Sequence, residues 1–109
     1  MVNVKDKLIE YATQYGIAIE QGDHKKANKN HYSLMTLYKM IKESGKLDSL
    51  KELILLPDSN VQLWAATFLL NYDTDLALKT LYKLTENKQI IGLTASTTID
   101  MWNKGMLKL

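Results

Sequence analysis

Residues 61–72 read VQLWAATFLLNY, and this stretch is apolar on almost every side of a helix. Six residues recur at helical spacing and form one stripe: Val61, Trp64, Ala65, Phe68, Leu69 and Tyr72. The opposite face is apolar as well, because it carries Leu63, Ala66 and Leu70. A helix that is apolar all round is packed on both sides. We therefore expect residues 61–72 to form the central helix of a helical domain.

The flanking residues predict where this helix begins and where the next one starts. Pro57 ends the segment before it, because proline disrupts a helix interior. Ser59, with Gln62 three residues later, is typical of a capping box in which the serine caps the helix. Asp73 or Thr74 is expected to cap the following helix. That helix is expected to have an apolar inward face and a charged outward face: Ala77, Leu81 and Leu84 against Lys79, Lys83 and Glu86.

Two long helices and a short one are expected before the central helix. The first covers about residues 4–21, and Gly22 supplies its C-terminal stop. The second covers about residues 24–44, with Asp23 as its cap and Gly45 at its end. The third is short, and its apolar residues are expected to face inward: Leu47, Leu50, Leu53 and Ile54.

The last segment, residues 89–102, reads QIIGLTASTTIDMW and fits two kinds of structure. Its threonines and isoleucines favour a strand. Four residues nevertheless keep helical spacing: Ile91, Ala95, Ile99 and Trp102. A shift of 30 residues also lays VQLWAATFLLNY on IGLTASTTIDMW and pairs similar residues: Val61 with Ile91, Leu63 with Leu93, Ala65 with Ala95, Leu69 with Ile99, and Tyr72 with Trp102. Because a sequence repeat implies a repeated structural unit, we predict a helix here.

Length and composition predict one domain over residues 1–109, since 109 residues are enough to bury a core. The chain has no cysteine, which excludes disulfides, thiolate nucleophiles and cysteine metal ligands. No apolar run reaches the roughly 18–20 residues that cross a bilayer. The charged start, MVNVKDKLIEY, does not resemble a signal peptide. We therefore expect a cytoplasmic protein that does not bind membranes.

Residues 55–84, LLPDSNVQLWAATFLLNYDTDLALKTLYKL, resemble a short HEAT-like repeat. The resemblance is carried by an Asp-rich turn that is followed by Val61, Ala65–Ala66 and Leu69–Leu70. It is fair over residues 89–105 and weak before residue 46, so the HEAT-like pattern covers residues 55–105. The chain departs from the pattern at Gln62, where HEAT repeats often carry an arginine that pairs with the turn aspartate. The ladder of arginine–aspartate pairs between HEAT repeats is therefore not expected here.

The whole chain is similar to a family of small bacterial proteins of unknown function that have a HEAT-like helical fold. Three segments carry this resemblance: GDHKKANK at 22–29, NVQLWAATFLL at 60–70 and MWNKG at 101–105. The resemblance implies an all-α fold, a five- or six-helix HEAT-like superhelix that forms a short solenoid. The family has no established activity, so it implies no catalytic residue.

The chemistry-bearing residues do not form a recognisable reactive site. His24 and His31 are seven residues apart, about 10.5 Å along a helix, whereas a metal pair on a helix needs a spacing of three or four. We expect His31 to lie at the edge of the core, bonded to a carbonyl. No nucleophile–base arrangement and no glycine-rich phosphate loop appears. The chain is therefore not expected to be an enzyme or to hold a metal or cofactor.

Aromatic residues are the best candidates for a binding surface, since Tyr and Trp often anchor interfaces. Trp64 and Trp102 lie on inward stripes and are assigned to the core, whereas Tyr82 is expected to be exposed. HEAT-like proteins tend to line their concave binding face with the second helix of each pair. This places the candidate contacts on the fifth expected helix: Lys79, Tyr82, Lys83 and Glu86. An ordinary solvated helix face explains the same pattern.

The sequence therefore favours a non-enzymatic protein–protein binding module with a protein partner. One alternative is an immunity protein that neutralises a bacterial toxin, which the small size permits. A third is nucleic-acid binding through a lysine-lined concave face. The net charge of only +2, and 14 lysines without any arginine, argue against it, because arginine makes the bidentate contacts to phosphate and guanine. The partner, the oligomeric state and the binding face stay open.

Overall fold

The computed structural model describes residues 3–107 and 109, and these residues form six helices. In chain order they are α1 (Val4–Gln21), α2 (His24–Glu43), η1 (Leu47–Leu55), α3 (Ser59–Leu69), α4 (Thr74–Leu84) and α5 (Ile90–Asn103). η1 is a 3-10 helix and the others are α-helices. The described residues contain no strand, which confirms the predicted all-α class. The last segment, which had features of both a strand and a helix, is helical.

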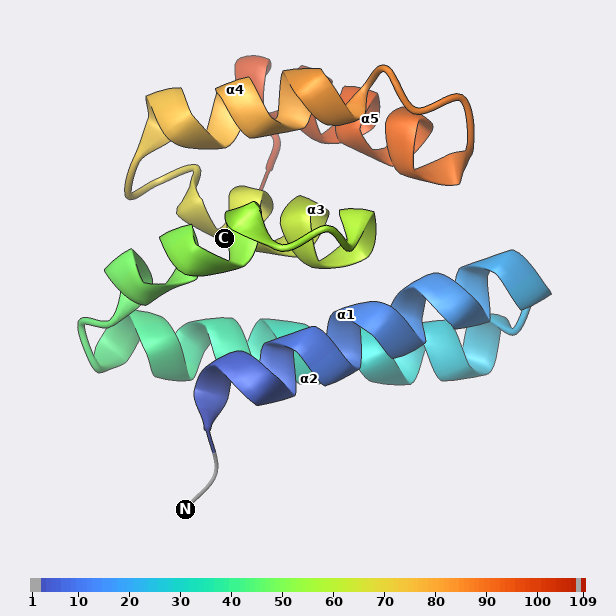
Figure 1. Cartoon of the computed structure of the whole chain (residues 1–109), viewed down its shortest axis with the longest axis horizontal. Coiled ribbons are helices and arrows are strands. Elements are labelled where there is room, and N and C mark those ends of the chain that lie inside the picture. Colours follow the sequence, from blue (N-terminus) through green and yellow to red (C-terminus); the bar gives the residue numbers. More distant parts are fainter. Residues whose placement is uncertain (1–2, 108) are drawn as a thin grey trace.

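The helices lie in three layers (Figure 1). α1 and α2 form one outer layer, η1 and α3 the middle layer, and α4 and α5 the other outer layer. α3 packs on η1 and α4, and it also contacts α1 and α5. The middle layer therefore joins the two outer layers, and the hydrophobic core follows α3.

α3 is buried along almost its whole length, as predicted for the central helix. Every side chain from Leu63 to Leu70 is buried. Phe68 stacks on Tyr38 of α2 with ring centroids 4.7 Å apart, and Trp64 meets Tyr15 of α1 edge-on at 5.3 Å. Aromatic pairs in these arrangements contribute about 0.5–1.5 kcal/mol beyond the burial of their area. The prediction that this helix is packed on both sides is confirmed.

Short polar side chains begin four of the helices. The side chains of Asn3, Asp23, Asp58 and Asp73 each accept a hydrogen bond from a backbone N–H of the first turn. α1 ends at Gly22, whose φ of 70° lies in the left-handed region that favours glycine. The chain therefore reverses within two residues, and α2 returns along α1 (Figure 1).

The predicted capping box at Ser59 is wrong. Asp58 is the cap of α3, because its Oδ1 accepts a hydrogen bond from the N–H of Asn60 at 2.8 Å. Ser59 is the first helical residue, and the Gln62 amide donates to the carbonyl of Leu56. A carboxylate is a stronger acceptor than a hydroxyl, which favours a cap one residue earlier.

Two further details concern the end of α3 and the start of α4. Tyr72, expected on the inward stripe of the central helix, lies beyond the end of α3 and is exposed, because the chain turns after Leu70. Asp73 is the cap of α4, and its carboxylate accepts a hydrogen bond from the N–H of Leu76. Thr74, the other residue predicted as a cap, is the first residue of the helix.

Candidate functional site

The middle helix α3 is shorter than α1, and this difference in length leaves a space beside the start of α3. α1 has 18 residues and α3 has 11, which corresponds to about 27 Å and about 16 Å at 1.5 Å per residue. Asn60, in the first turn of α3, lies against Gly16 of α1. The last turn of α1 therefore extends past the start of α3. The first turn of α5 also borders this end of α3, so the middle layer stops short between two outer layers.

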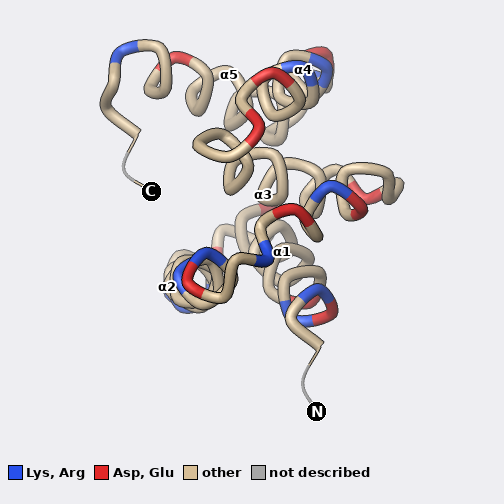
Figure 2. Tube along the Cα trace, turned by 90° about the vertical axis from the view of Figure 1, so that its left-hand side faces the viewer, with Lys and Arg blue, Asp and Glu red and all other residues tan. Residues whose placement is uncertain are grey.

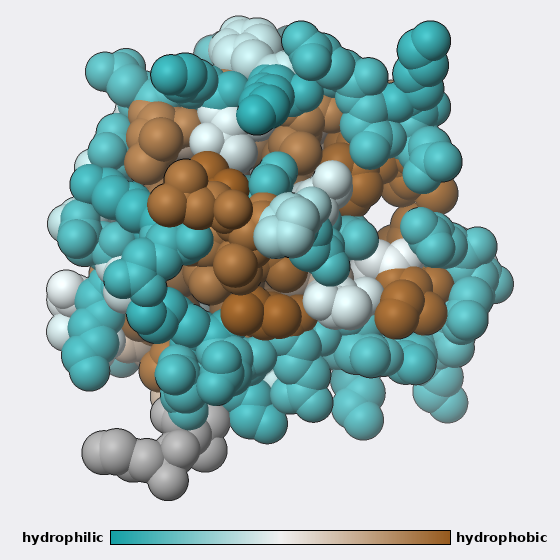
Figure 3. Space-filling view, viewed as in Figure 1, coloured by the Kyte–Doolittle hydropathy of each residue, from teal (hydrophilic) through white to brown (hydrophobic). Residues whose placement is uncertain are grey.

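The space left at this end is a cavity of about 530 Å³ between α1, α3 and the start of α5, which we call the α1–α5 groove. Cavities that hold ligands typically measure about 300–1,000 Å³. In the space-filling view, this side of the molecule is hollowed between the upper and lower layers, and hydrophobic residues border the hollow (Figure 3). The groove is therefore large enough for several side chains of a partner.

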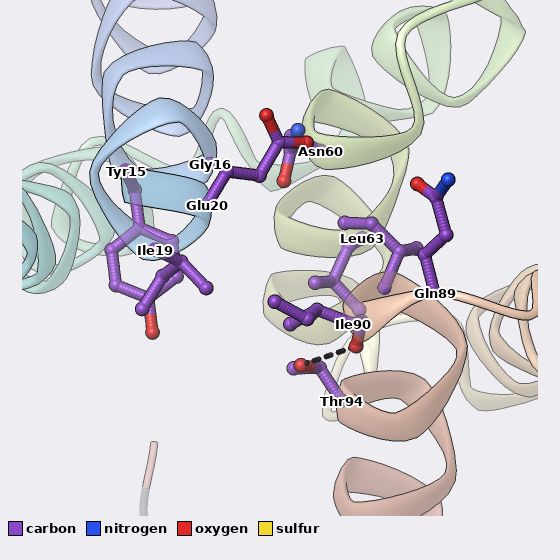
Figure 4. Close-up of a pocket in the computed structure, with 10 residues that line it drawn as sticks. Tyr15, Gly16, Ile19, Glu20, Asn60, Leu63, Gln89, Ile90 and Thr94 are labelled. Atoms are coloured by element: carbon purple, nitrogen blue, oxygen red, sulfur yellow. Dashed lines mark hydrogen bonds between the residues drawn. The ribbon is translucent and has the colours of Figure 1, made fainter. Parts of the chain in front are cut away.

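The walls of the groove are apolar. Tyr15 and Ile19 project from α1 on one side, and Leu63 and Ile90 project from α3 and α5 on the other (Figure 4). The two sets face each other across an open gap rather than packing together. Ile90 is 47% exposed, so part of this apolar surface is in contact with solvent. An occupant with apolar side chains would remove that surface from water, which is favourable.

Polar groups line the same groove in smaller number. Among the described residues that line it, Glu20 is the only charged one, and Asn60 and Gln89 contribute side-chain amides. The hydroxyl of Thr94 donates to the carbonyl of Ile90 at 2.9 Å, so its donor is already used (Figure 4). A few polar groups on an apolar wall are typical of sites that orient a bound partner.

Burial of the phenol of Tyr15 raises its pKa above the ordinary value. The phenol therefore stays neutral at physiological pH. Its ring also packs edge-on against Trp64 of the central helix. Tyr15 thus acts as a neutral wall of the groove that is held in place by the core.

The floor of the groove depends on a glycine within α1. A Cβ added at Gly16 would overlap the side chain of Asn60. Glycine at this position therefore lets the start of α3 approach α1 and places the Asn60 amide in the groove. Intrinsic helix propensity favours alanine over glycine by about 1 kcal/mol, so the close approach offsets an intrinsic cost.

An uncharged surface continues from the groove onto the outer face of α5. No charged residue occurs between Gln89 and Ile99, and Leu93 is 70% exposed. The hydroxyl of Thr97 donates to the carbonyl of Leu93, four residues earlier, at 3.0 Å. Thr94 and Thr98 make the same type of bond, so these hydroxyls are satisfied within the helix. Between residues 90 and 99, the described face of α5 therefore offers the aliphatic side chains of Ile90 and Leu93, hydroxyl side chains and no charge to a partner.

The chain also exposes more surface than its size explains. Its solvent-accessible surface is 6901 Å², whereas a monomeric protein of this size exposes about 6,200 Å². Its radius of gyration of 12.9 Å nevertheless matches the roughly 13 Å of a compact chain of this length. The difference in exposed surface is about 700 Å². One partner in an interface of standard size buries about 800 Å².

The four residues predicted as contacts lie together on another surface, which we call the α4 stripe. Lys79, Tyr82 and Lys83 lie on the outward face of α4, and Glu86 follows its end; all four are exposed. Neither the α1–α5 groove nor a smaller cavity of about 170 Å³ on α1 and α2 is lined by them. The exposure of Tyr82 is confirmed, and a binding role of the α4 stripe stays a prediction.

The histidines are both exposed. The ring of His31 packs edge-on against Trp64 with centroids 5.6 Å apart, so it borders the core as expected. Among the described residues, the contacts of the His31 ring are with the rings of Tyr15 and Trp64, and the predicted bond to a carbonyl is not present. Within residues 3–107 and 109, no group of three or more His, Cys, Asp or Glu side chains is placed to hold a metal ion.

Sequence reasoning did not identify the groove as a site. Tyr15, Ile19 and Leu63 belong to apolar stripes or faces of helices, which look the same whether a partner or the core covers them. Two signals were available: a glycine within the first helix, at residue 16, and the absence of charge from residue 89 to residue 99. The first marks a close approach of helices, and the second marks a helix without the usual charged outer face.

Comparisons of the chain with family models, with curated proteins and with solved structures give no match. Within the part of the chain that the structure describes, no helix is both long enough and apolar enough to cross a bilayer.

Proposed function

We propose that this chain is a non-enzymatic protein-binding module that binds its partner in the α1–α5 groove. The observation that carries this proposal is the pair of apolar walls, Tyr15 and Ile19 against Leu63 and Ile90, which face each other without a covering element. The extra exposed surface of a chain with ordinary compactness supports it. The uncharged face of α5, on which Leu93 is 70% exposed, adjoins the same surface.

The chemistry of the groove supports binding rather than catalysis. Its described lining contains one carboxylate, two amides, one hydroxyl that is already bonded and one phenol whose pKa is raised by burial. General acid–base or nucleophilic catalysis needs a nucleophile within hydrogen-bond reach of a base. None of the polar groups of the groove forms such a pair, and they are suited to orienting a partner.

We interpret the three layers as a short HEAT-like superhelix. The support is their order, α1 with α2, then η1 with α3, then α4 with α5, and the internal match between residues 61–72 and 91–102. In such an arrangement the last layer has one free face. The exposed and uncharged side of α5 corresponds to that face.

The distribution of charge favours a protein partner over nucleic acid. Lysines occur on α1, α2, η1, α4 and the C-terminal segment, and acidic residues lie among them (Figure 2). A phosphate backbone is bound most strongly where several cations converge on one face. An immunity protein is one case of the proposed function, in which the partner is a toxin.

The test is a capture experiment with the tagged chain as bait in an extract of the cells that express it. Three baits are compared at low and at high salt: wild type, Ile90→Asp in the groove and Tyr82→Asp on the α4 stripe. Ile90 is the first residue of α5, where an acidic residue is compatible with the helix. Both the protein and the nucleic acid recovered with each bait are identified.

We expect one protein, at a fixed ratio to the bait, with wild type and with Tyr82→Asp, and its loss with Ile90→Asp. Loss with Tyr82→Asp instead would move the site to the α4 stripe. Nucleic acid that elutes steeply as salt rises would overturn the proposal in favour of a lysine-lined face. A toxin as the recovered protein would select the immunity function.

A further inference from the structure

We propose that the α1–α5 groove binds an amphipathic α-helix of a different protein, and that this helix carries a lysine or arginine that pairs with Glu20. The inference rests on the proposed function and specifies the chemistry of the partner. It follows from the length of the groove, the shape of its walls and the one charged residue of its described lining. The fourth ground is that a second copy of this chain fits the groove less well than a different protein does.

The α1 wall of the groove corresponds to about one and a half turns of helix. It runs from Tyr15 to Glu20, and five residue steps of helix span about 7.5 Å. On an amphipathic helix, residues at i and i+3 or i+4 lie on one face and are separated by about 5–6 Å along the axis. Two apolar side chains at this spacing therefore match the α1 wall, and a third at i+7 extends just beyond it.

The walls require an occupant whose backbone hydrogen bonds are already made. Tyr15, Ile19, Leu63 and Ile90 offer no backbone edge to a bound chain, and the described lining contains only helical elements and the residue before α5. An extended peptide would bury N–H and C=O groups that find few partners there, which is costly. A helix satisfies these groups internally and presents only side chains. The amides of Asn60 and Gln89 remain available for polar side chains at its border.

The single charge of the groove defines the charge of the occupant. Glu20 is exposed, and it forms no ion pair with the described residues. It lies one residue after Ile19, the last apolar residue of that wall. A cation on the partner, within a turn of the apolar side chains, would therefore lie beside Glu20. An anion at that position would be repelled.

A second copy of this chain fits the groove less well than a different protein does. The groove is concave, so a copy would have to insert some other, convex surface. Such a head-to-tail contact is heterologous, and it generates rings or filaments instead of a closed pair. A convex apolar helix of another protein makes the contact once.

The test is a selection from a displayed library of random peptides about five turns long when helical. The probe is the library itself. Peptides that bind the Ile90→Asp variant are removed first, and the remaining peptides are selected for binding to the wild-type chain. We expect the enriched peptides to share apolar residues at i, i+3 or i+4, and i+7 with a lysine or arginine within one turn. Circular dichroism is expected to show helix formation when they bind. Enriched peptides with alternating apolar residues, or without a charge preference, would overturn the inference.

A charge exchange at residue 20 tests the pairing directly. Glu20→Lys is expected to weaken a selected peptide about three- to tenfold at low salt, and to strengthen the same peptide with its basic residue changed to glutamate. Glu86→Lys is the matched control, because it makes the same charge change on an exposed residue outside the groove; both affinities are expected to stay within about twofold. Equal effects of the two substitutions would overturn the pairing.

The outcomes separate this inference from the proposed function. If capture from the extract depends on Ile90 but the peptides show neither helical spacing nor dependence on Glu20, the groove binds a partner of another shape and only the inference fails. If capture does not depend on Ile90, the proposed function fails as well. Self-association of the wild-type chain that Ile90→Asp abolishes would assign the groove to a second copy and overturn the inference.

Discussion

Helices α3 and α5 have related sequences but opposite surroundings. With a shift of 30 residues, Leu63 aligns with Leu93 and Ala65 with Ala95. Both alanines are fully buried, whereas Leu63 is 3% exposed and Leu93 is 70% exposed. The middle layer lies between two outer layers, and α5 lies in an outer layer with one free side (Figure 1). The same apolar pattern thus forms a core in one helix and a free surface in the other.

The difference shows why α5 is informative about function. A surface helix usually carries charged residues on its outer face. α1, α2 and α4 do so, but α5 has no charged residue before Asp100. The absence of charge on the helix that also borders the groove is one reason for proposing a partner there.

The largest expected contrast comes from truncating the two aligned leucines. Leu63→Ala is expected to lower the free energy of unfolding by about 2–5 kcal/mol, because this groove-lining side chain is only 3% exposed and its truncation removes contacts with the core. Leu93→Ala is expected to change it by less than about 0.5 kcal/mol, because the side chain is exposed. Urea denaturation followed by tryptophan fluorescence measures both. Equal losses would show that α5 is covered in solution and would break the comparison.

The two helical glycines that make close contacts should respond differently to alanine. A Cβ at Gly92 would overlap the backbone carbonyl of Asn87, which cannot move away easily. Gly92→Ala is therefore expected to cost about 1–3 kcal/mol. The Cβ added by Gly16→Ala would contact only the side chain of Asn60, which can shift. The gain in helix propensity offsets the cost of that shift, so the free energy of unfolding is expected to change by less than about 1 kcal/mol.

Thermal unfolding followed by circular dichroism distinguishes these two cases. The Gly16→Ala chain should also lose affinity for a groove partner, since the Asn60 side chain has to move within the groove. Destabilisation of the same size by both substitutions would mean that the start of α3 is as rigid as the turn before α5. In that case the N-termini of α3 and α5 would not differ in rigidity.

A smaller contrast is expected at the caps of the two helices. Asp58 accepts hydrogen bonds at the start of α3, whereas the side chain of Gln89 makes no capping bond at the start of α5. Asp58→Ala is expected to cost about 1 kcal/mol, and Gln89→Asp to stabilise the chain by about 0.5–1 kcal/mol. Ser59→Ala serves as the control and should have little effect. A large loss with Ser59→Ala would restore the serine as the cap.

The smallest expected effect is alkaline destabilisation through Tyr15, which packs on α3 and not on α5. Burial raises its pKa in the folded chain above the value in the unfolded chain. The corresponding stability is complete below the unfolded pKa of about 10, and it is lost as pH rises through the higher folded pKa. Tyr15→Phe should therefore lose less stability than wild type above about pH 10. Urea midpoints at neutral and alkaline pH measure this, with Tyr82→Phe on exposed α4 as the control; identical profiles for Tyr15→Phe and wild type would contradict it.

Local chemistry explains which parts of the fold were predictable. The helix before residue 22 and the helix after residue 23 follow from a stripe, a left-handed glycine and an acidic cap, all of which act within a few residues. The burial of α3 on all sides follows from its uniform apolar character. The helical state of the last segment was predictable from the repeat, and its threonines tolerate the helix because their hydroxyls bond to carbonyls four residues earlier.

Errors arose where two neighbouring residues compete for one role. Asp58 and Ser59 both suit a helix cap, and the carboxylate is the cap although the spacing of serine and glutamine predicts otherwise. Tyr72 keeps helical spacing with α3 but follows a turn, so periodicity alone places it on the wrong side. Such choices depend on small energy differences that a residue pattern does not contain.

The residue pattern alone predicted that this protein is all-helical, approximately where its helices lie, and that the segment around residues 61–70 is the central helix. These properties depend on contacts within a helix and on the period of apolar residues. That Tyr15 and Ile90, 75 positions apart, face each other across a groove became visible when the helices were packed together. The physical reason is that a groove depends on the relative lengths of packed helices and on how closely they approach. An apolar side chain has the same identity whether its own core or a partner covers it.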